Sequence, residues 1–319
     1  MANHDVTTCK IAVLAGGWSD EREVSAQSGA EVARALAEGG FANVDVLDPA
    51  APSFFDELQR GEYDVAFVAM HGRLGEDGAI QGLLEVLHLP YTFSGVYASA
   101  LAMEKGSAKV MFDRVGIPVP QGRVLDSAEQ TEQELDGLVA CLGLPLFVKP
   151  VGNGSSFGVT RVTERSELAD AIKKAASDGS RVLVESEVEG TEITVPVIGN
   201  DEPRALPIIE VVTGSDFYDQ RVKYEPSELH HVIPARVSED VYALAQEYAI
   251  RAHKVLGCRG CSRSDFIIRE DGTPVILETN TIPGMTSASL LPDSARHYGI
   301  EFPELCRLFV EMALEGRTS

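Results

Sequence analysis

The stretch that decides the fold reads SRSDFIIREDGTPVILETN and spans residues 262–280. Two runs rich in apolar and β-branched residues flank the dipeptide Asp271-Gly272, which is a strong signal for a two-residue turn between antiparallel strands. Residues at equal distances from such a turn face each other across the hairpin. Asp265 is therefore predicted to lie directly opposite Glu278.

Polar side chains are expected to gather on one face of this hairpin, because side chains alternate between the two faces of a strand. They are Arg263, Asp265, Glu278 and Asn280, with Ile267 and Ile276 nearer the turn. The opposite face carries Phe266, Ile268, Val275 and Leu277. The hairpin is thus predicted to have one side that packs and one side that is available for chemistry.

Two carboxylates placed directly opposite each other lie roughly 5 Å apart and repel. A divalent cation between Asp265 and Glu278 removes this repulsion, and Asn280 adds a third oxygen. Oxygen-only ligands suit Mg²⁺ or Mn²⁺ rather than zinc, and Mg²⁺ held by few protein ligands takes the others from water and substrate phosphates. The alternative is a plain polar face with Arg263 as the counter-ion. The alignment of all four polar residues favours the metal site.

The composition is that of a globular protein with a sizeable core: the chain has 319 residues, of which 44% are hydrophobic and 24% charged. The formal net charge of −22 repels nucleic acid and anionic membrane surfaces, so neither is expected as a partner. A small anionic substrate would need local basic residues that act against the overall charge.

The cysteines and the first residues indicate a cytoplasmic protein. Five cysteines without dense spacing are typical of reduced thiols. Cys258 and Cys261 form a C-x-x-C pair, but no second pair or nearby histidines complete a zinc set, and we interpret the pair as incidental. The opening residues have no leader of the signal-peptide type, and no apolar stretch reaches membrane-spanning length.

The first hundred residues alternate strand and helix patterns, which predicts a parallel sheet covered by helices. Strands are expected at 10–17, 43–48, 63–72 and 89–95, and helices at 19–40, opening at Ser19 and Asp20, and at 79–87. Functional groups of such folds collect at the carboxyl ends of the strands. His71 lies at one such end, and the Gly-Gly turn after the first strand leads to Glu21.

The remainder divides into two further units. The second has a helix around Lys105, helices near 129–141 and 166–177, and strands at 144–150, 158–162 and 181–186. The third has strands at 193–199 and 205–212, a loop over 213–234, a long helix near 239–256, the hairpin, and a closing helix near 301–314.

A glycine-rich segment, LFVKPVGNGSSFGVT at 146–160, lies between two of these strands. It lacks the Gly-Lys-Ser/Thr of a Walker A loop, but its small residues would allow backbone N–H groups to approach phosphate oxygens. Lys149 and Lys105 would add positive charge. The alternative is an ordinary hairpin loop. A nucleotide, magnesium and such a loop together indicate phosphoryl transfer.

These motifs resemble those of the D-alanine–D-alanine ligases, which belong to the ATP-grasp superfamily, and the resemblance covers nearly the whole chain. The matching segments, in order, are AGGWSDEREVS at 15–25, MHGRLGEDGAIQGLLE at 70–85, the Lys105 helix, KPVGNGSSFGV at 149–159, FYDQRVKY at 217–224, GCRGCSRSD at 257–265, LETNTIPGMTS at 277–287 and PGMTSASLLP at 283–292. Each match is modest, but their common order is specific.

The resemblance implies a three-domain ATP-grasp fold that combines α/β and α+β architecture. An N-terminal parallel α/β domain would span 1–102, a central domain 103–188 and a catalytic domain 189–319. It also implies a homodimer. The implied reaction activates one D-alanine with ATP as an acylphosphate, from which the amine of a second D-alanine displaces phosphate. The product would serve peptidoglycan precursor synthesis.

The resemblance also implies the residues that bind the first D-alanine. Glu21 would hold its ammonium group, and Ser155 and Tyr224 would hydrogen-bond with Glu21 and close the site. His71 would lie nearby. Two structural alternatives remain open: an acid at a helix N-terminus is stabilised by the helix dipole, and a histidine at a strand end is often part of the packing.

The remaining implied roles concern ATP, metal and the second substrate. Lys105, Lys149 and Lys223 would contact phosphates, and Glu185, Glu192, the Val188 backbone and Phe217 would surround adenine and ribose. Asp265, Glu278 and Asn280 match the family's ligands for two Mg²⁺ or Mn²⁺ ions. Arg263 and the Gly284 N–H would stabilise the transferring phosphoryl group and the tetrahedral intermediate, and Ser289 would receive the second carboxylate. Ser289 could otherwise be a plain helix cap.

Three alternatives are weighed against this interpretation. A ligase for D-lactate or D-serine is the nearest, but Lys223-Tyr224 and Ser289-Leu290 resemble the dipeptide-forming type. A non-catalytic ATP-binding module would be expected to have lost Arg263, Glu21 or a metal ligand. An NAD enzyme is set aside because the first turn is not G-x-G-x-x-G. The chain departs from the family pattern at Phe157, Glu187 and Gln220.

Overall fold

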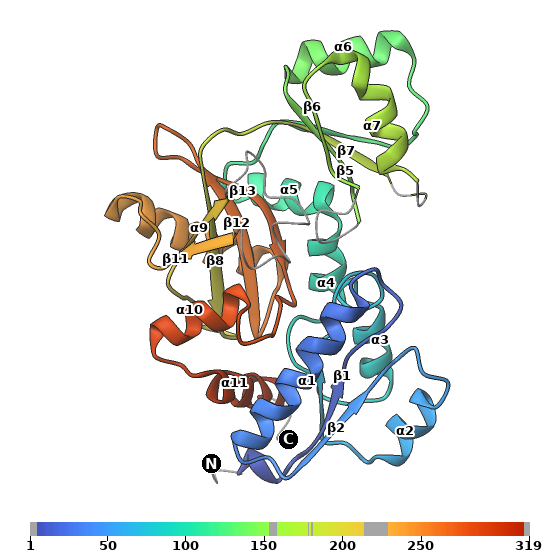
Figure 1. The fold of residues 1–319 in the computed structure, drawn as a ribbon, viewed down its shortest axis with the longest axis vertical. Helices are drawn as coiled ribbons and strands as arrows, with labels where there is room; N and C mark the ends of the chain where they lie inside the picture. Colours follow the sequence, from blue (N-terminus) through green and yellow to red (C-terminus); the bar gives the residue numbers. More distant parts are fainter. Residues whose placement is uncertain (1–4, 153–157, 178, 180, 214–228, 316–319) are drawn as a thin grey trace.

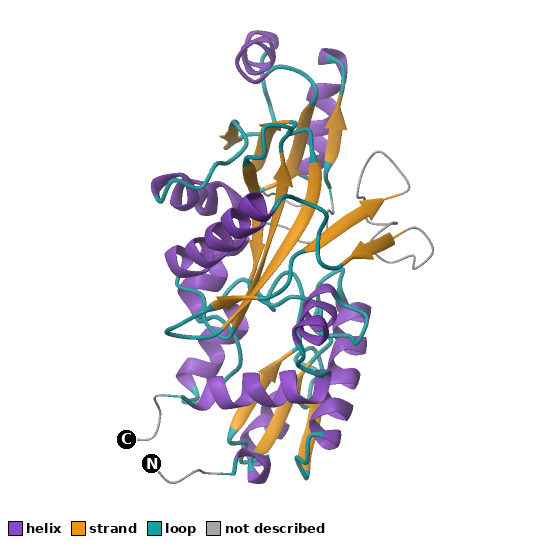
Figure 2. Cartoon of the chain, turned by 90° about the vertical axis from the view of Figure 1, so that its left-hand side faces the viewer, coloured by secondary structure: helices purple, strands orange, loops and turns teal. Residues whose placement is uncertain are grey.

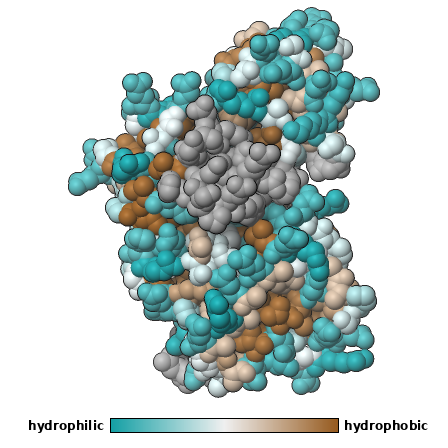
Figure 3. Space-filling model, in the orientation of Figure 1, coloured by the Kyte–Doolittle hydropathy of each residue, from teal (hydrophilic) through white to brown (hydrophobic). Residues whose placement is uncertain are grey.

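The structure is a computed structural model that describes residues 5–152, 158–177, 179, 181–213 and 229–315. Its sheets form three groups along the long axis of the molecule, with helices on their faces (Figures 1 and 2). A short 3₁₀ helix, η1 (Val6–Thr8), precedes the first strand. Outside the grey area of Figure 3, hydrophilic side chains cover much of the face drawn, with apolar areas between them.

The first sheet is parallel, as predicted, with the order β2-β1-β3. Its elements are β1 (Lys10–Leu14), α1 (Arg22–Glu38), β2 (Asn43–Leu47), α2 (Phe54–Arg60), β3 (Val65–Val68) and α3 (Ala79–Val86). The predicted strand at 89–95 is wrong, because only a bridge between Ala66 and Tyr91 forms. Phe93 adopts a φ of 71°, and this left-handed conformation ends the extended pairing.

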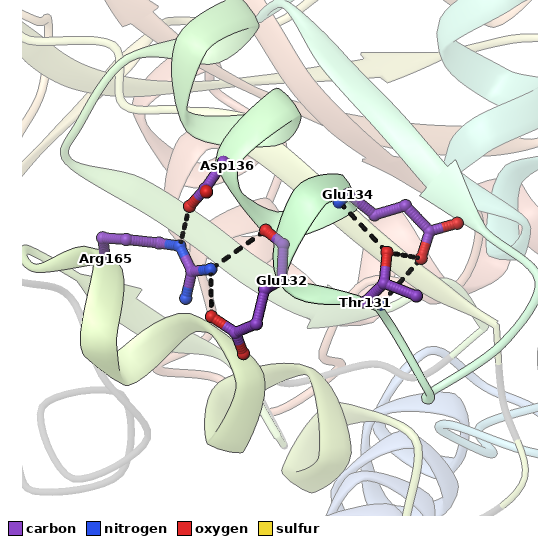
Figure 4. A network of polar contacts seen from close by, with 5 residues as sticks. All are labelled: Thr131, Glu132, Glu134, Asp136 and Arg165. Atoms are coloured by element: carbon purple, nitrogen blue, oxygen red, sulfur yellow. Dashed lines mark hydrogen bonds and ion pairs between the residues drawn. The ribbon is translucent and has the colours of Figure 1, made fainter.

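The second sheet is antiparallel, with the order β4-β7-β5-β6. Its strands are β4 (Gly122–Leu125), β5 (Leu146–Pro150), β6 (Thr160–Val162) and β7 (Val182–Ser186), and α6 (Glu132–Leu142) and α7 (Leu168–Ala175) cover it. The sequence interpretation missed β4. Thr131 and Glu134 form a capping box that starts α6 (Figure 4). Arg165, in the 3₁₀ helix η2 (Arg165–Glu167), binds Glu132 and Asp136 of α6.

The third sheet has six strands in the order β11-β10-β8-β12-β13, with β9 paired to β8. They are β8 (Thr191–Ile198), β9 (Arg204–Ala205), β10 (Ile209–Thr213), β11 (Leu229–Val232), β12 (Cys261–Ile268) and β13 (Pro274–Asn280). α4 (Val96–Met103), α5 (Lys105–Arg114) and the long helix α9 (Glu239–Leu256), predicted at 239–256, pack with this sheet. The predicted loop at 213–234 is wrong at its end, because β11 pairs there with β10.

The last two helices, α10 (Leu290–Tyr298) and α11 (Phe302–Leu314), return to the first sheet and share its core. The ring of Phe309 on α11 meets Phe93 edge-on at 5.0 Å, and Phe93 meets Phe67 of β3 at 5.4 Å. The helix α11 and the first sheet therefore share one hydrophobic cluster. The boundaries at 102 and 188 stay a prediction.

The hairpin β12–β13 keeps the predicted charged face but reaches it differently. Asp265 pairs with Glu278 and Arg263 with Asn280, as predicted. The turn is longer than the predicted two residues, since Arg269 N donates to Thr273 O. A bulge after Asp265 corrects the register.

The bulge also exchanges two apolar side chains between the faces of the hairpin. Ile276 pairs with Phe266 on the packed face, and Val275 pairs with Ile267. The predicted faces of Val275 and Ile276 are therefore wrong. Ile276 is fully buried with Phe266, which is the physical reason for the shift.

The five cysteines are free. Burial raises the pKa of Cys258 to about 12 and that of Cys261 well above its ordinary value, so neither is a thiolate at neutral pH. Among the described residues, no helix combines the length and apolarity that a membrane span requires.

Phe309→Ala should lower the free energy of unfolding by about 3–5 kcal/mol, because it leaves a cavity between α11 and the first sheet. Chemical denaturation followed by circular dichroism measures this change. Phe55→Ala is the control, since its side chain is 61% exposed and its loss should change stability by about 0.5 kcal/mol. Equal losses in the two variants would contradict the shared core.

Candidate active site

The first part of the site is the turn that follows β1. Gly16 and Gly17 have φ values of 94° and 83°, which L-residues with side chains rarely adopt, and they lead the chain sharply into α1. Glu21 lies at the N-cap of α1, but its carboxylate makes no capping hydrogen bond. The predicted opening of this helix at Ser19 and Asp20 is wrong, because α1 begins at Arg22; the Ser19 hydroxyl donates to His71 O and accepts from Glu21 N.

The loop after β3 packs against Glu21. A Cβ at Gly72 would come within 2.6 Å of the Glu21 carboxylate, so only glycine permits this approach. His71 is buried, and its Nε2 lies 3.1 Å from the Ser28 hydroxyl of α1. His71 therefore has a packing role between the loop and α1 whether or not it also contacts a substrate.

Glu76 is a functional candidate that the sequence interpretation missed. Its carboxyl is 6% exposed, one oxygen accepts from Gly72 N at 3.0 Å, and the other has no hydrogen-bond partner among the described residues. Burial, reinforced by the Glu21 carboxylate, raises the pKa of Glu76 to about 8, while Lys105 and Arg263 act to lower it. The charges that act on Glu76 therefore come from the N-terminal turn, from α5 and from the hairpin.

Each carboxylate of the hairpin is paired with a cation. Arg263 donates two hydrogen bonds to Asp265, at 3.0 and 2.9 Å, and Lys105 Nζ lies 3.3 Å from Glu278. Asp265 also accepts a hydrogen bond of 2.5 Å from Thr194 of β8. Arg263 is thus a counter-ion in this structure, as the alternative to the metal site expected.

The chemistry of the donor set fits a hard divalent cation. Asp265, Glu278 and Asn280 offer carboxylate and amide oxygens from two paired strands. Within the described ranges, no cluster of three or more histidine, cysteine or acidic side chains is placed to hold a metal. A metal here would therefore depend on Asn280 as its third ligand.

Three more charged groups lie between the second and third sheets. Glu185 of β7 is buried, and its two oxygens lie 2.8 Å from Lys109 Nζ and 2.5 Å from Lys149 Nζ. Although burial acts to raise the pKa of Glu185, the two lysines hold it below its ordinary value. Lys109 was not predicted, because a lysine on a helix ordinarily points to solvent.

The predicted residues of the second substrate come together on the loop before α10. A Cβ at Gly284 would lie 2.9 Å from Ser289 Oγ. Ser289 is the N-cap of α10, but its hydroxyl accepts from Thr286 N at 3.1 Å and makes no cap bond. The plain-cap alternative therefore does not describe its side chain. Leu290 is the first residue of α10.

Two other predicted residues lie at or near the start of β8, and the rest lie outside the described residues. Glu192 lies on β8, paired with Ile267. Val188 lines an open cavity of about 660 Å³ together with Glu187 and Arg269. Six residues named in the sequence analysis lie outside the described residues. They are the predicted site residues Ser155, Phe217, Lys223 and Tyr224, and Phe157 and Gln220, which depart from the family pattern.

A cluster of lysines and a carboxylate joins the second and third sheets, and the similarity to solved D-alanine ligases identifies the fold as ATP-grasp. Family models described as the D-ala D-ala ligase N-terminus and C-terminus match residues 49–94 and 111–311. The chain belongs to the D-alanine–D-alanine ligase family.

Individual relatives agree with this assignment. The D-alanine–D-alanine ligase of Desulforamulus reducens is 44% identical over 310 residues, which is 96% of this chain and 99% of the relative. A D-alanine–D-alanine ligase from Bacillus anthracis, solved in complex with ATP, superposes with a TM-score of 0.82 at 29% identity over 96% of this chain and 98% of that one. The VanG D-Ala:D-Ser ligase from Enterococcus faecalis superposes with a TM-score of 0.80 at 30% identity, over 96% of this chain and 99% of that one.

Glu76→Gln should change how stability depends on pH. The folded-state pKa of about 8 lies above the ordinary value of 4.5, so the contribution of Glu76 to stability is full below pH 4.5 and is lost as the pH rises through 8. Glutamine does not ionise, so the melting temperature of the variant relative to the parent should increase from pH 5 to pH 9. Thermal denaturation at both pH values measures this difference, and a constant difference would contradict a buried acid.

Proposed function

We propose that this protein joins two D-alanine molecules into D-alanyl-D-alanine, with ATP converted to ADP and phosphate, for peptidoglycan precursors in the cytoplasm. The observation that carries the proposal is membership of this family, and the electrostatic influence of Glu21, Lys105 and Arg263 on the buried carboxyl of Glu76 supports it. Arg263 and Lys105 would bind phosphate oxygens here by exchanging their carboxylate partners Asp265 and Glu278, although the chain carries a net charge of −22.

In the first step, a carboxylate oxygen of the first D-alanine attacks the γ-phosphorus of ATP, and ADP leaves. Glu21 holds the ammonium group of this substrate, near His71. Lys105, Lys149 and Lys223 neutralise the phosphates, while Glu185, Glu192, Val188 and Phe217 hold adenine and ribose. The product is a D-alanyl phosphate.

In the second step, the amine of the second D-alanine attacks the carbonyl carbon of that acylphosphate, phosphate leaves, and the nitrogen loses a proton. Arg263 and the Gly284 N–H stabilise the negative charge that develops on the attacked oxygen. Ser289, at the start of α10, receives the second carboxylate, and Leu290 follows it. Ser155 and Tyr224 hydrogen-bond with Glu21 and close the site.

Two Mg²⁺ or Mn²⁺ ions would be held by Asp265, Glu278 and Asn280. These ions would neutralise the negative charge of the phosphates. Support for this proposal comes from the oxygen-only donor set and from the pairing of the first two residues across the hairpin. Arg263 and Lys105 would then exchange these carboxylates for the phosphoryl oxygens of the substrates.

Arg263→Ala should reduce turnover by at least about a hundredfold, because a preorganised donor to the transition state is lost. Binding of ATP, followed by calorimetry, should change by less than tenfold. Arg165→Ala is the matched control, since Arg165 also binds two acidic groups but on the surface of the second sheet (Figure 4). Near-normal turnover of Arg263→Ala would contradict the role assigned to this residue.

The second substrate separates the proposal from its alternatives. D-Alanine should outcompete D-serine and D-lactate at neutral pH when the products formed from ATP, Mg²⁺ and D-alanine are analysed by mass spectrometry. Predominant D-alanyl-D-serine would favour the relationship to the Enterococcus faecalis enzyme instead. ATP binding without D-alanine-dependent release of phosphate would indicate a non-catalytic ATP-binding module.

We also propose that the protein forms a homodimer. The neighbouring helices α3 and α4 expose the apolar side chains of Val86, Val96 and Tyr97, which would be covered by a second copy. Sedimentation of the parent and of Tyr97→Glu measures this association. A monomeric parent chain would refute the proposal. A dimer that persists in the variant would place the interface elsewhere.

A further inference from the structure

Lys109 connects the two sheets that enclose the proposed nucleotide site. It lies one turn after Lys105 on α5, so both side chains leave the same face of the helix. Its Nζ donates to Leu277 O of β13 at 2.9 Å and lies 2.8 Å from Glu185 of β7. A single buried ammonium group therefore contacts the second and third sheets at once.

Glu185 is shared between two lysines. Lys109 contacts one carboxylate oxygen and Lys149 of β5 contacts the other, and all three side chains are at most 13% exposed. The cluster thus contains two positive charges and one negative charge. One of the two lysines can therefore bind an anionic ligand while the other still neutralises the carboxylate of Glu185.

We propose that Lys109 is a positioning residue that keeps Glu185 paired, so that Lys149 is released from Glu185 to bind the phosphates of ATP. This inference rests on the proposed role of Lys149 in nucleotide binding. With Lys109 present, the transfer of Lys149 leaves a neutral pair between Lys109 and Glu185. Without Lys109, the same transfer would leave a buried carboxylate with no cation, which is strongly unfavourable.

The charge states agree with this exchange. Burial lowers the pKa of Lys109 to about 8, opposed by Glu185, so Lys109 is mostly protonated at neutral pH. Burial also acts to lower the pKa of Lys149, but Glu185 outweighs it and the pKa is raised. Lys149 is thus a stable cation that is bound to Glu185 in the absence of nucleotide.

The quantity that tests the proposal is the ratio of the dissociation constants for adenosine and ATP, measured on the full chain by calorimetry. This ratio measures the contribution of the phosphates to binding. Contacts of Glu185 with adenine affect adenosine and ATP equally and therefore cancel. Lys109→Met should lower the ratio by at least about tenfold, because Glu185 then retains Lys149. Lys173→Met, an exposed lysine on α7, controls for the change in net charge and should leave the ratio unchanged.

The double variant Lys109→Met/Glu185→Gln distinguishes release of Lys149 from a purely structural role. Without the carboxylate, Lys149 is free again, and the ratio should return to within about threefold of the parent. A structural role predicts instead equal losses for adenosine and ATP, with no recovery in the double variant, and that result would overturn the proposal. The double variant removes the carboxylate that Lys109 and Lys149 share and leaves Lys149 as the single charge of the cluster.

Lys149→Met separates this inference from the proposed function. A lowered ratio in this variant confirms that Lys149 binds phosphates, which the inference requires, and an unchanged ratio overturns the inference. The proposed ligase activity is judged separately, by D-alanine-dependent release of phosphate from ATP in the parent chain. Lys109→Arg keeps a cation at this position, so its ratio of dissociation constants should lie closer to that of the parent than the ratio of Lys109→Met does.

Discussion

The arrangement of the site depends on one register, that of Asp265 opposite Glu278 in the hairpin β12–β13. Two acidic side chains this close are tolerated because each has its own cation, Arg263 for one and Lys105 for the other. Lys105 comes from α5 and not from the hairpin, so the register also fixes where this helix must lie. A shift of β13 by one residue would turn Glu278 toward the apolar face and away from Lys105, whereas Arg263 and Asp265 would stay together because both lie on β12.

How this register arises explains what the sequence could and could not predict. The alternation of polar and apolar residues and the Asp271-Gly272 turn signal were enough to pair Asp265 with Glu278. The predicted turn was too short, and the bulge beside Asp265 compensates for it. Turn chemistry is local and readable, whereas a bulge is selected by the packing of Ile276, which no local pattern contains.

The same distinction applies to the other residues of the site. Glu21 and the lysines at 105 and 149 could be found because they lie in motifs or at the ends of predicted elements. The burial of Glu76 and Lys109 could not be predicted from the sequence, because the groups around them come from distant segments of the chain. Arg263 acts on Glu76, and Leu277 O accepts a hydrogen bond from Lys109. Buried charges of this kind require the tertiary fold before they can be recognised.

Hydrogen bonds and apolar packing show which parts of the site are held together. The loop of Gly284 and Ser289 is tied to α1, because Ser287 N donates to Glu31 at 2.7 Å. Glu21 is the N-cap of α1, and apolar residues of α1 and of the loop before α10, such as Leu36 and Met285, share one hydrophobic cluster. Lys149 and Glu185 belong to the second sheet, which has a core of its own. The contacts of α5 with both sheets therefore set the distance between the proposed phosphate donor and the amino acids, which a phosphoryl transfer requires to be short.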